Sequence, residues 1–453
     1  MAKSKSKIKR FAGLDIAKES IYACIVDRSG FKLEEVFDTK TKSIYKLVKW
    51  LKKHNVKETV LENTGIYSEP VIAIVKGSIT LHVVNAADTK RSNKKKTDSS
   101  DAWWLAELLK AGSIGKGCKI ETSYLATQNE QQLKKMTRTR SKNISLSTQQ
   151  KNKIIKIFTR HNIKIYNYFE SNHFTKTSIT LYRAIAEGKK IETLINELIE
   201  KDLVLEGSKK RTNKRILNFL EKNLQELNGI LNSGIINEIP REDRIELLIA
   251  LEYLRLAEDI IEILNDEINR LQQSNEKYSE QLEILYSIPG IGETTASQIL
   301  AEIPPLDRFK NEKQCASYTG LCPRVTQSAE VCHLGSINKR GPKYLREALY
   351  QAAKVASMRT NNSLGRKFKR LYKRKGKGKG KICWIAIARH LASLIYILLT
   401  RKQKYFDPGY KTKSWELARK KLKKMTVSDI AEQLKEQNYQ VYIYSTEDGT
   451  VLS

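Results

Sequence analysis

The sequence predicts an N-terminal α/β domain followed by a chain that is mainly helical. The first observation is that short apolar runs rich in β-branched residues alternate with helical patterns between residues 8 and 85. The second is that helical periodicity dominates from residue 123 onward. The third is length, because 453 residues are enough for two or three domains with buried cores.

The elements of the first domain follow a distinctive order. We expect strands at 8–17, 22–30 and 32–39, a helix at 42–53, a strand at 56–62, a helix at 68–76, a strand at 79–85 and a helix from about Asp98. Residues 28–30 have the composition of a turn between the second and third strands. The RNase H-like fold has this order of elements: three strands, a helix, a strand, a helix, a strand and a helix. The sequence therefore predicts an RNase H-like fold for this domain.

Four acidic residues stand at particular places in this order: Asp15 in the first strand, Glu62 at the end of the fourth, and Asp98 with Asp101 on the last helix. In an RNase H-like domain these places converge at one edge of the sheet. Carboxylates that hold two cations about 4 Å apart can stabilise both the entering and the leaving oxygen of a phosphate. We therefore predict that these four residues bind Mg²⁺ or Mn²⁺. The plainer alternative is a helix cap at Asp98, a strand end at Asp15 and a solvated acid at Glu62.

Charge and cysteine usage limit the class of protein. There are 82 Lys and Arg residues against 50 Asp and Glu, a net charge of +32, which is typical of a protein that binds nucleic acid. Six cysteines without a CxxC pair indicate reduced thiols in a cytoplasm. The apolar stretch 382–399 contains Arg389 and His390, as a buried or amphipathic helix does, and the basic N-terminus is not a signal peptide. We expect a soluble protein with no membrane partner.

The middle of the chain combines basic helices with a heptad pattern. Residues 123–160 are rich in lysine and arginine, and we predict that Arg138 and Arg140 bind nucleic acid; a solvated helix face is the alternative. Apolar residues at a and d spacing follow, namely Leu247, Ala250, Leu254, Ala257, Ile261, Leu264, Ile268 and Leu271. They predict a coiled coil that pairs either with a second copy or with the helices of the 190s or 220s.

Residues 289–292, PGIG, lie between two helical segments, as in a helix-hairpin-helix motif. We predict that Gly290 and Gly292 let backbone amides approach a phosphate at a helix N-terminus. A tight turn between two helices requires the same glycines, so that alternative stays open.

We expect a loop at 320–341, and this loop and the helix start beyond it surround two serines with cations. The serines are Ser328 and Ser336, and the cations are Arg324, Lys339, Arg340, Lys343 and Arg346. A serine hydroxyl held among cations that pair with phosphate can attack phosphorus, although serine in a polar loop is also ordinary. The run 366–381 has ten Lys or Arg residues with interleaved glycines, which predicts a flexible phosphate-binding segment.

Six motifs resemble, in the same order, those of the IS110 and Piv family of DEDD transposases. They are FAGLDIAK, VLENTG, KTDSSDAWWLAELL, LYSIPGIGETTASQILAEI, GLCPRVTQSAEVCHLGSINKRGPKYLREAL and WIAIARHLASLIYILL. The resemblance covers most of 8–160 and 280–405. It implies that the N-terminal domain is RuvC-like, that the four acids are the DEDD residues, and that Ser328 is the catalytic serine. Family members have glycine after this serine where this chain has Ala329, so Ser336 is kept as a rival.

The resemblance also implies an organisation into four parts. These are a RuvC-like DEDD domain (1–120), a helical and coiled-coil region (121–280), a mainly α serine-containing transposase domain with the helix-hairpin-helix-like motif (281–410) and an accessory extension (411–453). The helical middle from about 165 to 275 is longer than is usual for the family.

The function implied is that of a transposase of an insertion sequence, which cuts and rejoins DNA through a covalent phosphoserine with metal-binding carboxylates. Its partners would be donor and target DNA and a structured noncoding guide RNA, the bridge RNA of the element, in a prokaryotic cytoplasm at the nucleoid. Recombination cuts several strands in one complex, so we also expect a homo-oligomer, a dimer or tetramer. Two alternatives are a RuvC-like nuclease that uses water as nucleophile and a non-enzymatic RNA-binding protein.

Overall fold

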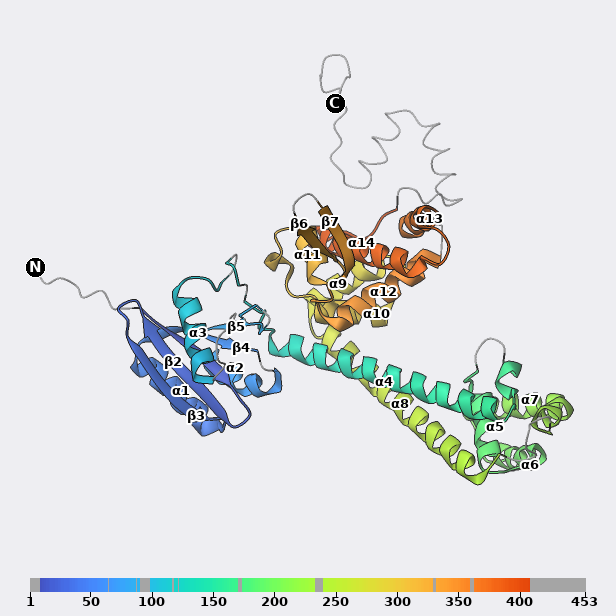
Figure 1. Ribbon diagram of the computed structural model, residues 1–453. Helices are drawn as coiled ribbons and strands as arrows, with labels where there is room; N and C mark the ends of the chain where they lie inside the picture. The colour runs from blue at the N-terminus through green and yellow to red at the C-terminus, as the bar shows by residue number, and fades with distance from the viewer. Residues whose placement is uncertain are drawn as a thin grey trace, which may run out of the picture. The chain divides into compact units, whose positions relative to one another are not determined.

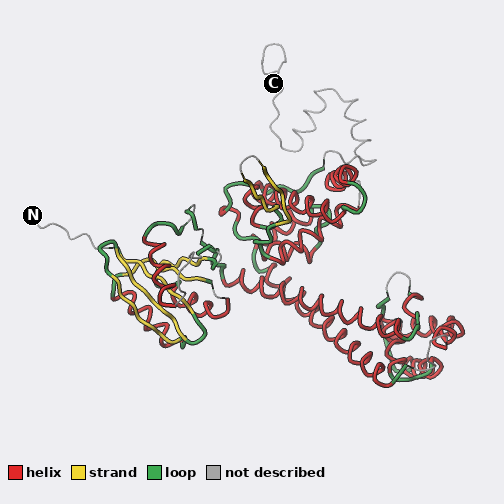
Figure 2. Tube along the Cα trace, viewed as in Figure 1, coloured by secondary structure: helices red, strands yellow, loops and turns green. Residues whose placement is uncertain are grey.

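The computed structural model describes residues 9–63, 65–86, 88–89, 98–115, 118–120, 122–169, 173–232, 239–328, 331–358 and 362–407. The chain divides into two compact units, residues 1–127 and 128–453 (Figure 1). The first contains a mixed β-sheet with helices, and the second is mainly helical (Figure 2). This arrangement confirms the predicted change from α/β to helical structure. The finer division at 120, 280 and 410 stays a prediction, and 411–453 lies outside the described residues.

The first unit is built on a five-stranded sheet in the order β3-β2-β1-β4-β5. The strands are β1 (Arg10–Ile16), β2 (Ser20–Asp27), β3 (Lys32–Asp38), β4 (Val56–Glu62) and β5 (Thr80–Val84). β1 pairs with β2, and β2 with β3, in antiparallel fashion, whereas β1 with β4 and β4 with β5 are parallel. All five strands lie where the sequence pattern predicts them.

Helices cover both faces of this sheet. They are α1 (Thr41–Lys53), a short 3-10 turn η1 (Gly65–Tyr67), α2 (Ser68–Val75) and α3 (Asp98–Lys110). α1 and α2 share a core with Ala12 and Leu14 of β1, whereas α3 shares a separate core with Phe11. A methyl group on Gly13 would lie 2.1 Å from the carbonyl oxygen of Ala102, so glycine is required for α3 to approach β1 this closely.

In the second unit, α4 (Gln128–Arg160) and α8 (Arg241–Gln273) lie side by side (Figure 1). Ion pairs fix their direction as antiparallel, because Lys151 contacts Glu258 at 2.9 Å and Arg160 contacts Asp243 at 2.6 Å. The heptad positions of α8 supply most of its buried side chains. Their main partner is α4 of the same chain, which the sequence pattern does not identify.

Three further helices gather at one end of this pair. They are α5 (Lys176–Ala186), α6 (Ile191–Asp202) and α7 (Gly207–Asn232), preceded by the 3-10 turn η2 (Ile165–Tyr168). Their apolar faces form one core with the end of α4 and the start of α8. Tyr182 is its largest fully buried side chain.

The C-terminal part of this unit has a core of its own. Its elements are α9 (Glu276–Tyr286), α10 (Glu293–Glu302), the 3-10 turn η3 (Leu306–Arg308), α11 (Glu312–Tyr318), β6 (Pro323–Ser328), β7 (Val331–Ile337), α12 (Lys343–Met358), α13 (Ser363–Lys375) and α14 (Gly380–Arg401). Among the described residues, α14 is the one helix long and apolar enough to cross a membrane by length and composition. Its buried side chains from Ile387 to Leu399 pack in this core beside α11, α12 and α13.

Two expectations for this part are corrected. The segment 320–341 is not a loop throughout, since β6 and β7 pair as an antiparallel hairpin. The run 366–381 is not a flexible segment, because α13 covers it to Lys375 and α14 begins at Gly380. The apolar side chains Leu364, Phe368 and Leu371 pack in or against the core and thereby hold the basic helix in place.

Candidate functional site

Asp15 and Glu62 stand at the carboxyl ends of neighbouring parallel strands. Leu14 of β1 is paired with Leu61 of β4, so the next residue on each strand is one of the two acids. Side chains alternate between the faces of a sheet, and Gly13 and Val60 lie on the face that packs against α3. Asp15 and Glu62 therefore lie side by side on the α3 face of the sheet.

The other two predicted ligands belong to the first turn of α3. Asp101 directly precedes Ala102, whose carbonyl oxygen lies against Gly13. Asp98 is the first residue of α3, and its side chain lies outside the described set. Among the described side chains, no three His, Cys, Asp or Glu groups are placed to hold one metal ion. The topology thus brings all four positions to one face, while metal binding by them stays a prediction.

Glu62 is held in place by a short chain of hydrogen bonds. The hydroxyl of Thr89 donates to Glu62 Oε2 at 3.1 Å, and Trp104 Nε1 of α3 donates to the Thr89 carbonyl oxygen at 3.1 Å. Thr89 is only 6% exposed. The sequence pattern does not indicate Thr89. The partly buried indole N–H of Trp104, which needs an acceptor, is the signal that leads to it.

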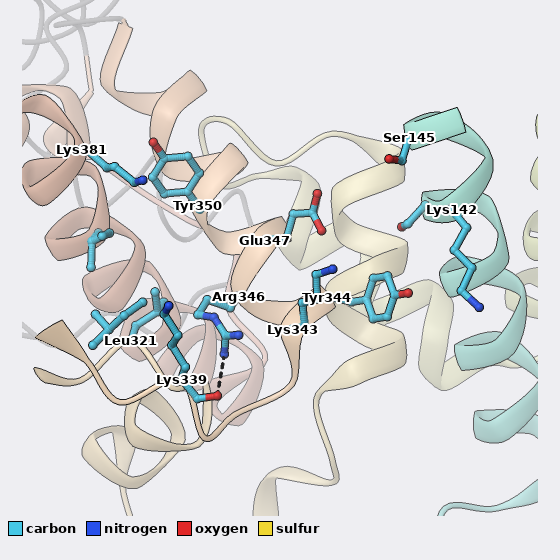
Figure 3. Close-up of a pocket in the computed structure, with 13 residues that line it drawn as sticks. Lys142, Ser145, Leu321, Lys339, Lys343, Tyr344, Arg346, Glu347, Tyr350 and Lys381 are labelled. Carbon is cyan, nitrogen blue, oxygen red and sulfur yellow. Dashed lines mark hydrogen bonds between the residues drawn. The ribbon is translucent and has the colours of Figure 1, made fainter. Parts of the chain in front are cut away.

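The second unit contains a basic pocket of about 640 Å³ between α4, α12, α14 and the root of the β6–β7 hairpin (Figure 3). Its cations are Lys142, Lys339, Lys343, Arg346 and Lys381, beside a single acid, Glu347, and the aromatic rings of Tyr344 and Tyr350. A concave surface with this excess of positive charge attracts anions. Three of the five cations are predicted from the sequence. The other two, Lys142 and Lys381, are brought in by helices distant in the chain.

Close backbone contact fixes the root of the hairpin. A methyl group on Gly341 would lie 2.0 Å from the Tyr318 carbonyl oxygen, and one on Gly320 would lie 2.7 Å from the Gly341 nitrogen. Arg346 Nη1 donates to the Gly341 carbonyl oxygen at 2.9 Å. It also donates to the Lys339 carbonyl oxygen at 3.4 Å (Figure 3). The guanidinium group of Arg346 thus orients the loop as well as lining the pocket.

Ser328 is the last residue of β6 and is paired with Val331 of β7. Its side chain lies outside the described set, so the structure places only its backbone. Arg324 on β6, Ser336 on β7 and Arg340 after the hairpin are exposed. The candidate serine is therefore carried by a hairpin whose root borders the basic pocket.

Arg138 and Arg140 bind partners within the chain. Arg138 donates to both carboxylate oxygens of Glu302, at 2.6 and 2.9 Å, and Glu302 is 1% exposed. This bond raises the pKa of the Arg138 guanidinium, whereas burial lowers the pKa of Arg140, which donates to Asn265 and Thr294. These bonds hold α4 on α8 and α10, and nucleic-acid binding by the two arginines stays a prediction.

The glycines of PGIG have different surroundings. Gly290 has a φ of +87°, and a methyl group on it would lie 2.4 Å from the Ala352 carbonyl oxygen and 2.7 Å from the Ala356 nitrogen. Close packing of the turn on α12 therefore accounts for Gly290. Gly292 is the N-cap of α10, and a methyl group there would meet nothing within 4 Å. Gly292 and the first two residues of α10 are exposed.

Comparison with known proteins identifies relatives for both units. A family model described as Transposase IS116/IS110/IS902 family matches residues 282–370, and a DEDD transposase model of the IS110 type matches residues 12–163. The two regions together make up just over half of the chain.

Individual relatives are similar over shorter stretches. The pilin gene-inverting protein of Moraxella bovis is 32% identical over 177 residues, which are 38% of this chain and 54% of that protein. The transposase for insertion sequence element IS1111A of Coxiella burnetii is 30% identical over 184 residues, 40% of this chain and 48% of the relative. A probable family 20 transposase of Pseudomonas aeruginosa is 28% identical over 161 residues, 35% and 47% of the two chains. The chain thus spans about half the length of the curated relatives that it matches.

Proposed function

Because the chain belongs to the IS110 family of transposases, we propose that it is a DNA recombinase of an insertion sequence that acts through a covalent phosphoserine. The observation that carries the proposal is the basic pocket. It lies at the root of the β6–β7 hairpin, in which Ser328 is the last residue of β6. Three of the five pocket cations, Lys339, Lys343 and Arg346, lie in the region 282–370 that the transposase family model matches. A fourth, Lys381, follows that region in the sequence. A phosphodiester is the anion that this arrangement would bind next to a serine.

We further propose that the first unit is an RNase H-like, RuvC-like domain. Support comes from the strand order β3-β2-β1-β4-β5, with its antiparallel first three strands and parallel remainder. In this proposal Asp15, Glu62, Asp98 and Asp101 hold a divalent cation, Mg²⁺ or Mn²⁺. The donor set fits these hard cations because it consists of carboxylate oxygens only. When bound, the cation would neutralise charge on the phosphate and favour deprotonation of the attacking hydroxyl.

The proposed reaction conserves phosphodiester bonds. Ser328 Oγ loses its proton and attacks phosphorus, and as the new bond forms, the bond to the 3′ oxygen of the DNA breaks. The 3′ oxygen takes up a proton and leaves as a hydroxyl group. The 3′ hydroxyl of another strand then attacks the phosphoserine, which rejoins the DNA and restores the serine. No ATP is required, because each bond broken is replaced by another of the same kind.

The cations around the hairpin would bind the phosphate during these steps. Arg324, Lys339, Arg340 and Lys343 are the candidates, with Arg346 orienting the loop that carries Lys339. Arginine suits this role through paired N–H groups, and lysine acts as a point charge. Gly292 at the start of α10 would offer backbone amides to a neighbouring phosphate.

Choice of sequence would reside in a structured noncoding RNA of the element, which pairs with target and donor DNA. The net charge of +32 supports contact with two polyanions at once, since each neutralised phosphate releases counterions. Double-stranded parts of such an RNA would be recognised by shape and backbone. The reaction would take place in the cytoplasm of a prokaryotic cell, at the nucleoid.

An oligomer, a dimer or tetramer, is part of the proposal. Its support is an apolar stripe on α8 outside the face that packs on α4. Ile245, Ile249, Tyr253, Leu256 and Ile263 are between 46% and 67% exposed and recur at spacings of three, four and seven residues. Exposed apolar stripes of this kind commonly mark contacts between protein chains.

The decisive experiment is to trap the intermediate. Element DNA, guide RNA and Mg²⁺ are incubated with the protein, the reaction is stopped with denaturant, and peptides are examined by mass spectrometry for an attached nucleotide. We expect the adduct on Ser328 and its loss in Ser328→Ala and Asp98→Ala. An adduct on Ser336 would overturn the assignment of the nucleophile. Cleavage without any adduct would favour a nuclease that uses water, and cleavage unchanged by Asp98→Ala would overturn both enzymatic functions.

A further inference from the structure

The surface of α13 combines a strongly basic face with an apolar anchor. Arg366, Lys369, Arg370 and Lys373 recur at i, i+3, i+4 and i+7 and therefore share one side of the helix. The opposite side carries Leu364, Phe368 and Leu371, which are buried in or packed against the C-terminal core. The basic face is thus turned away from the core and held in a fixed position.

Negative charge is scarce in the sequence on either side of α13. The sequence has no Asp or Glu between Glu347 and Asp407, a stretch that contains 16 lysines and arginines. Asp407 is bonded to Arg366, at the first turn of α13, at 2.6 Å. Burial lowers the pKa of Lys367, and repulsion from the neighbouring Arg370 lowers it further. The polymer that would relieve this repulsion is a polyanion.

Aromatic rings on the core-facing side of α13 join this helix to the wall of the basic pocket. The ring of Phe368 is stacked with Tyr372 at 5.8 Å and with Trp384 of α14 at 5.7 Å. Trp384 also meets the ring of Tyr350 edge-on, at 6.3 Å, and Tyr350 lines the pocket together with Lys381. Tyr350 and Lys381 lie on the same side of the pocket in Figure 3. The helix α13 therefore packs next to the wall of the pocket that Tyr350 and Lys381 form.

The turn between α13 and α14 is shaped to display lysines. Gly376 and Gly378 have φ values of +88° and +80°, which side-chain-bearing residues rarely adopt. The intervening Lys377 and the following Lys379 are exposed. The turn therefore extends the basic face of α13 toward Lys381 at the pocket.

We propose that the basic face of α13, with the turn 376–379, binds the backbone of the DNA duplex that leads out of the basic pocket. The inference rests on the proposed function, since continuity with the pocket is what selects DNA among polyanions. A helix of 13 residues is about 20 Å long, which corresponds to roughly six base pairs. Contacts of lysine and arginine with phosphates carry no sequence information, so this surface adds affinity and orientation.

The test compares two charge-matched variants of the full chain. In the first, Lys369→Gln, Arg370→Gln and Lys373→Gln remove three exposed cations from α13. In the control, Lys209→Gln, Lys210→Gln and Arg211→Gln remove three exposed cations from α7. Binding to a 30-base-pair duplex is measured over a range of salt concentrations. For the α13 variant we expect a slope of log K against log salt that is smaller by about 2.7 and an affinity on the order of tenfold lower. The control should keep the slope of the unmodified chain.

Further measurements separate the possible failures. Lys377→Gln with Lys379→Gln, outside any helix, should give a smaller change in the same direction and guards against misfolding of α13. Equal losses in the α13 and α7 variants would overturn the inference, because the effect would then be one of net charge. Loss of binding to a structured RNA hairpin with unchanged binding to DNA would assign the surface to RNA instead. Binding requires no chemistry, so the same measurements on Ser328→Ala remain informative if the phosphoserine proposal fails.

Discussion

Thr89 is a single residue on which the position of a proposed ligand depends. Its hydroxyl donates to Glu62 and its carbonyl oxygen accepts from Trp104, so it connects the end of β4 to α3. Valine has nearly the same shape but no hydroxyl. In Thr89→Val we expect the Mg²⁺ concentration for half-maximal strand cleavage to rise about tenfold, as is typical when a partner of a metal ligand is lost.

The control for this prediction is Thr89→Ser, which keeps the hydroxyl and should keep the Mg²⁺ requirement close to that of the unmodified chain. Thermal unfolding of both variants distinguishes positioning from stability. If Thr89→Val and Thr89→Ser need the same Mg²⁺ concentration, the hydroxyl does not position Glu62 for metal binding.

Cysteine reactivity provides a second prediction at the scale of single residues. Cys24 and Cys315 are buried, and burial raises the pKa of each thiol to about 12, with a further contribution from Glu34 at Cys24. The thiolate is the reactive form, so neither should react at neutral pH. Treatment of the folded protein with iodoacetamide at pH 7.5, followed by peptide mass spectrometry, should leave both unmodified. Modification of both after unfolding in urea is the positive control, and rapid labelling of either in the folded chain would contradict the structure.

At the scale of elements, an ion pair with a buried carboxylate joins α4 to α10. Glu302 is almost fully buried and accepts two hydrogen bonds from Arg138, with Lys134 3.5 Å away. Arg138→Met would leave the carboxylate without its main partner. We expect the free energy of unfolding to fall by about 3 kcal/mol, measured by urea denaturation.

The double variant Arg138→Met with Glu302→Gln tests the cause of that loss. Removing the buried charge together with its partner should recover part of the stability, because no unpaired carboxylate remains. A double variant less stable than Arg138→Met alone would show that packing, and not charge, explains the effect.

The same elements show which parts of the structure can be predicted from the sequence. Local periodicity predicts all five strands of the first unit and the place of the four acids, because each signal lies within a few residues. The partner of Arg138 is 164 residues away, and an interaction over that distance leaves no local pattern. In α13 the density of lysine and glycine suggests a flexible segment. The helix is indicated instead by three apolar residues at spacings of four and three, Leu364, Phe368 and Leu371, which are few among the lysines. The basic pocket is predicted only in part, since Lys142 and Lys381 reach it from other helices.

At the scale of the whole molecule, the proposed carboxylates and the proposed serine belong to different compact units of the chain. Recombination cuts several strands in one complex, so we propose that the acids of one subunit work with Ser328 of another. Mixing Asp101→Ala with Ser328→Ala subunits then creates sites with intact acids from one chain and an intact serine from the other. In a randomly mixed dimer about a quarter of all sites would be intact. The phosphoserine adduct should therefore reappear at about a quarter of its normal yield, although each variant alone gives none. Mixing Asp101→Ala with Asp15→Ala is the matched control, since both subunits lack the same half of the site and no adduct should form. If the first mixture also gives no adduct, each site is completed within a single chain.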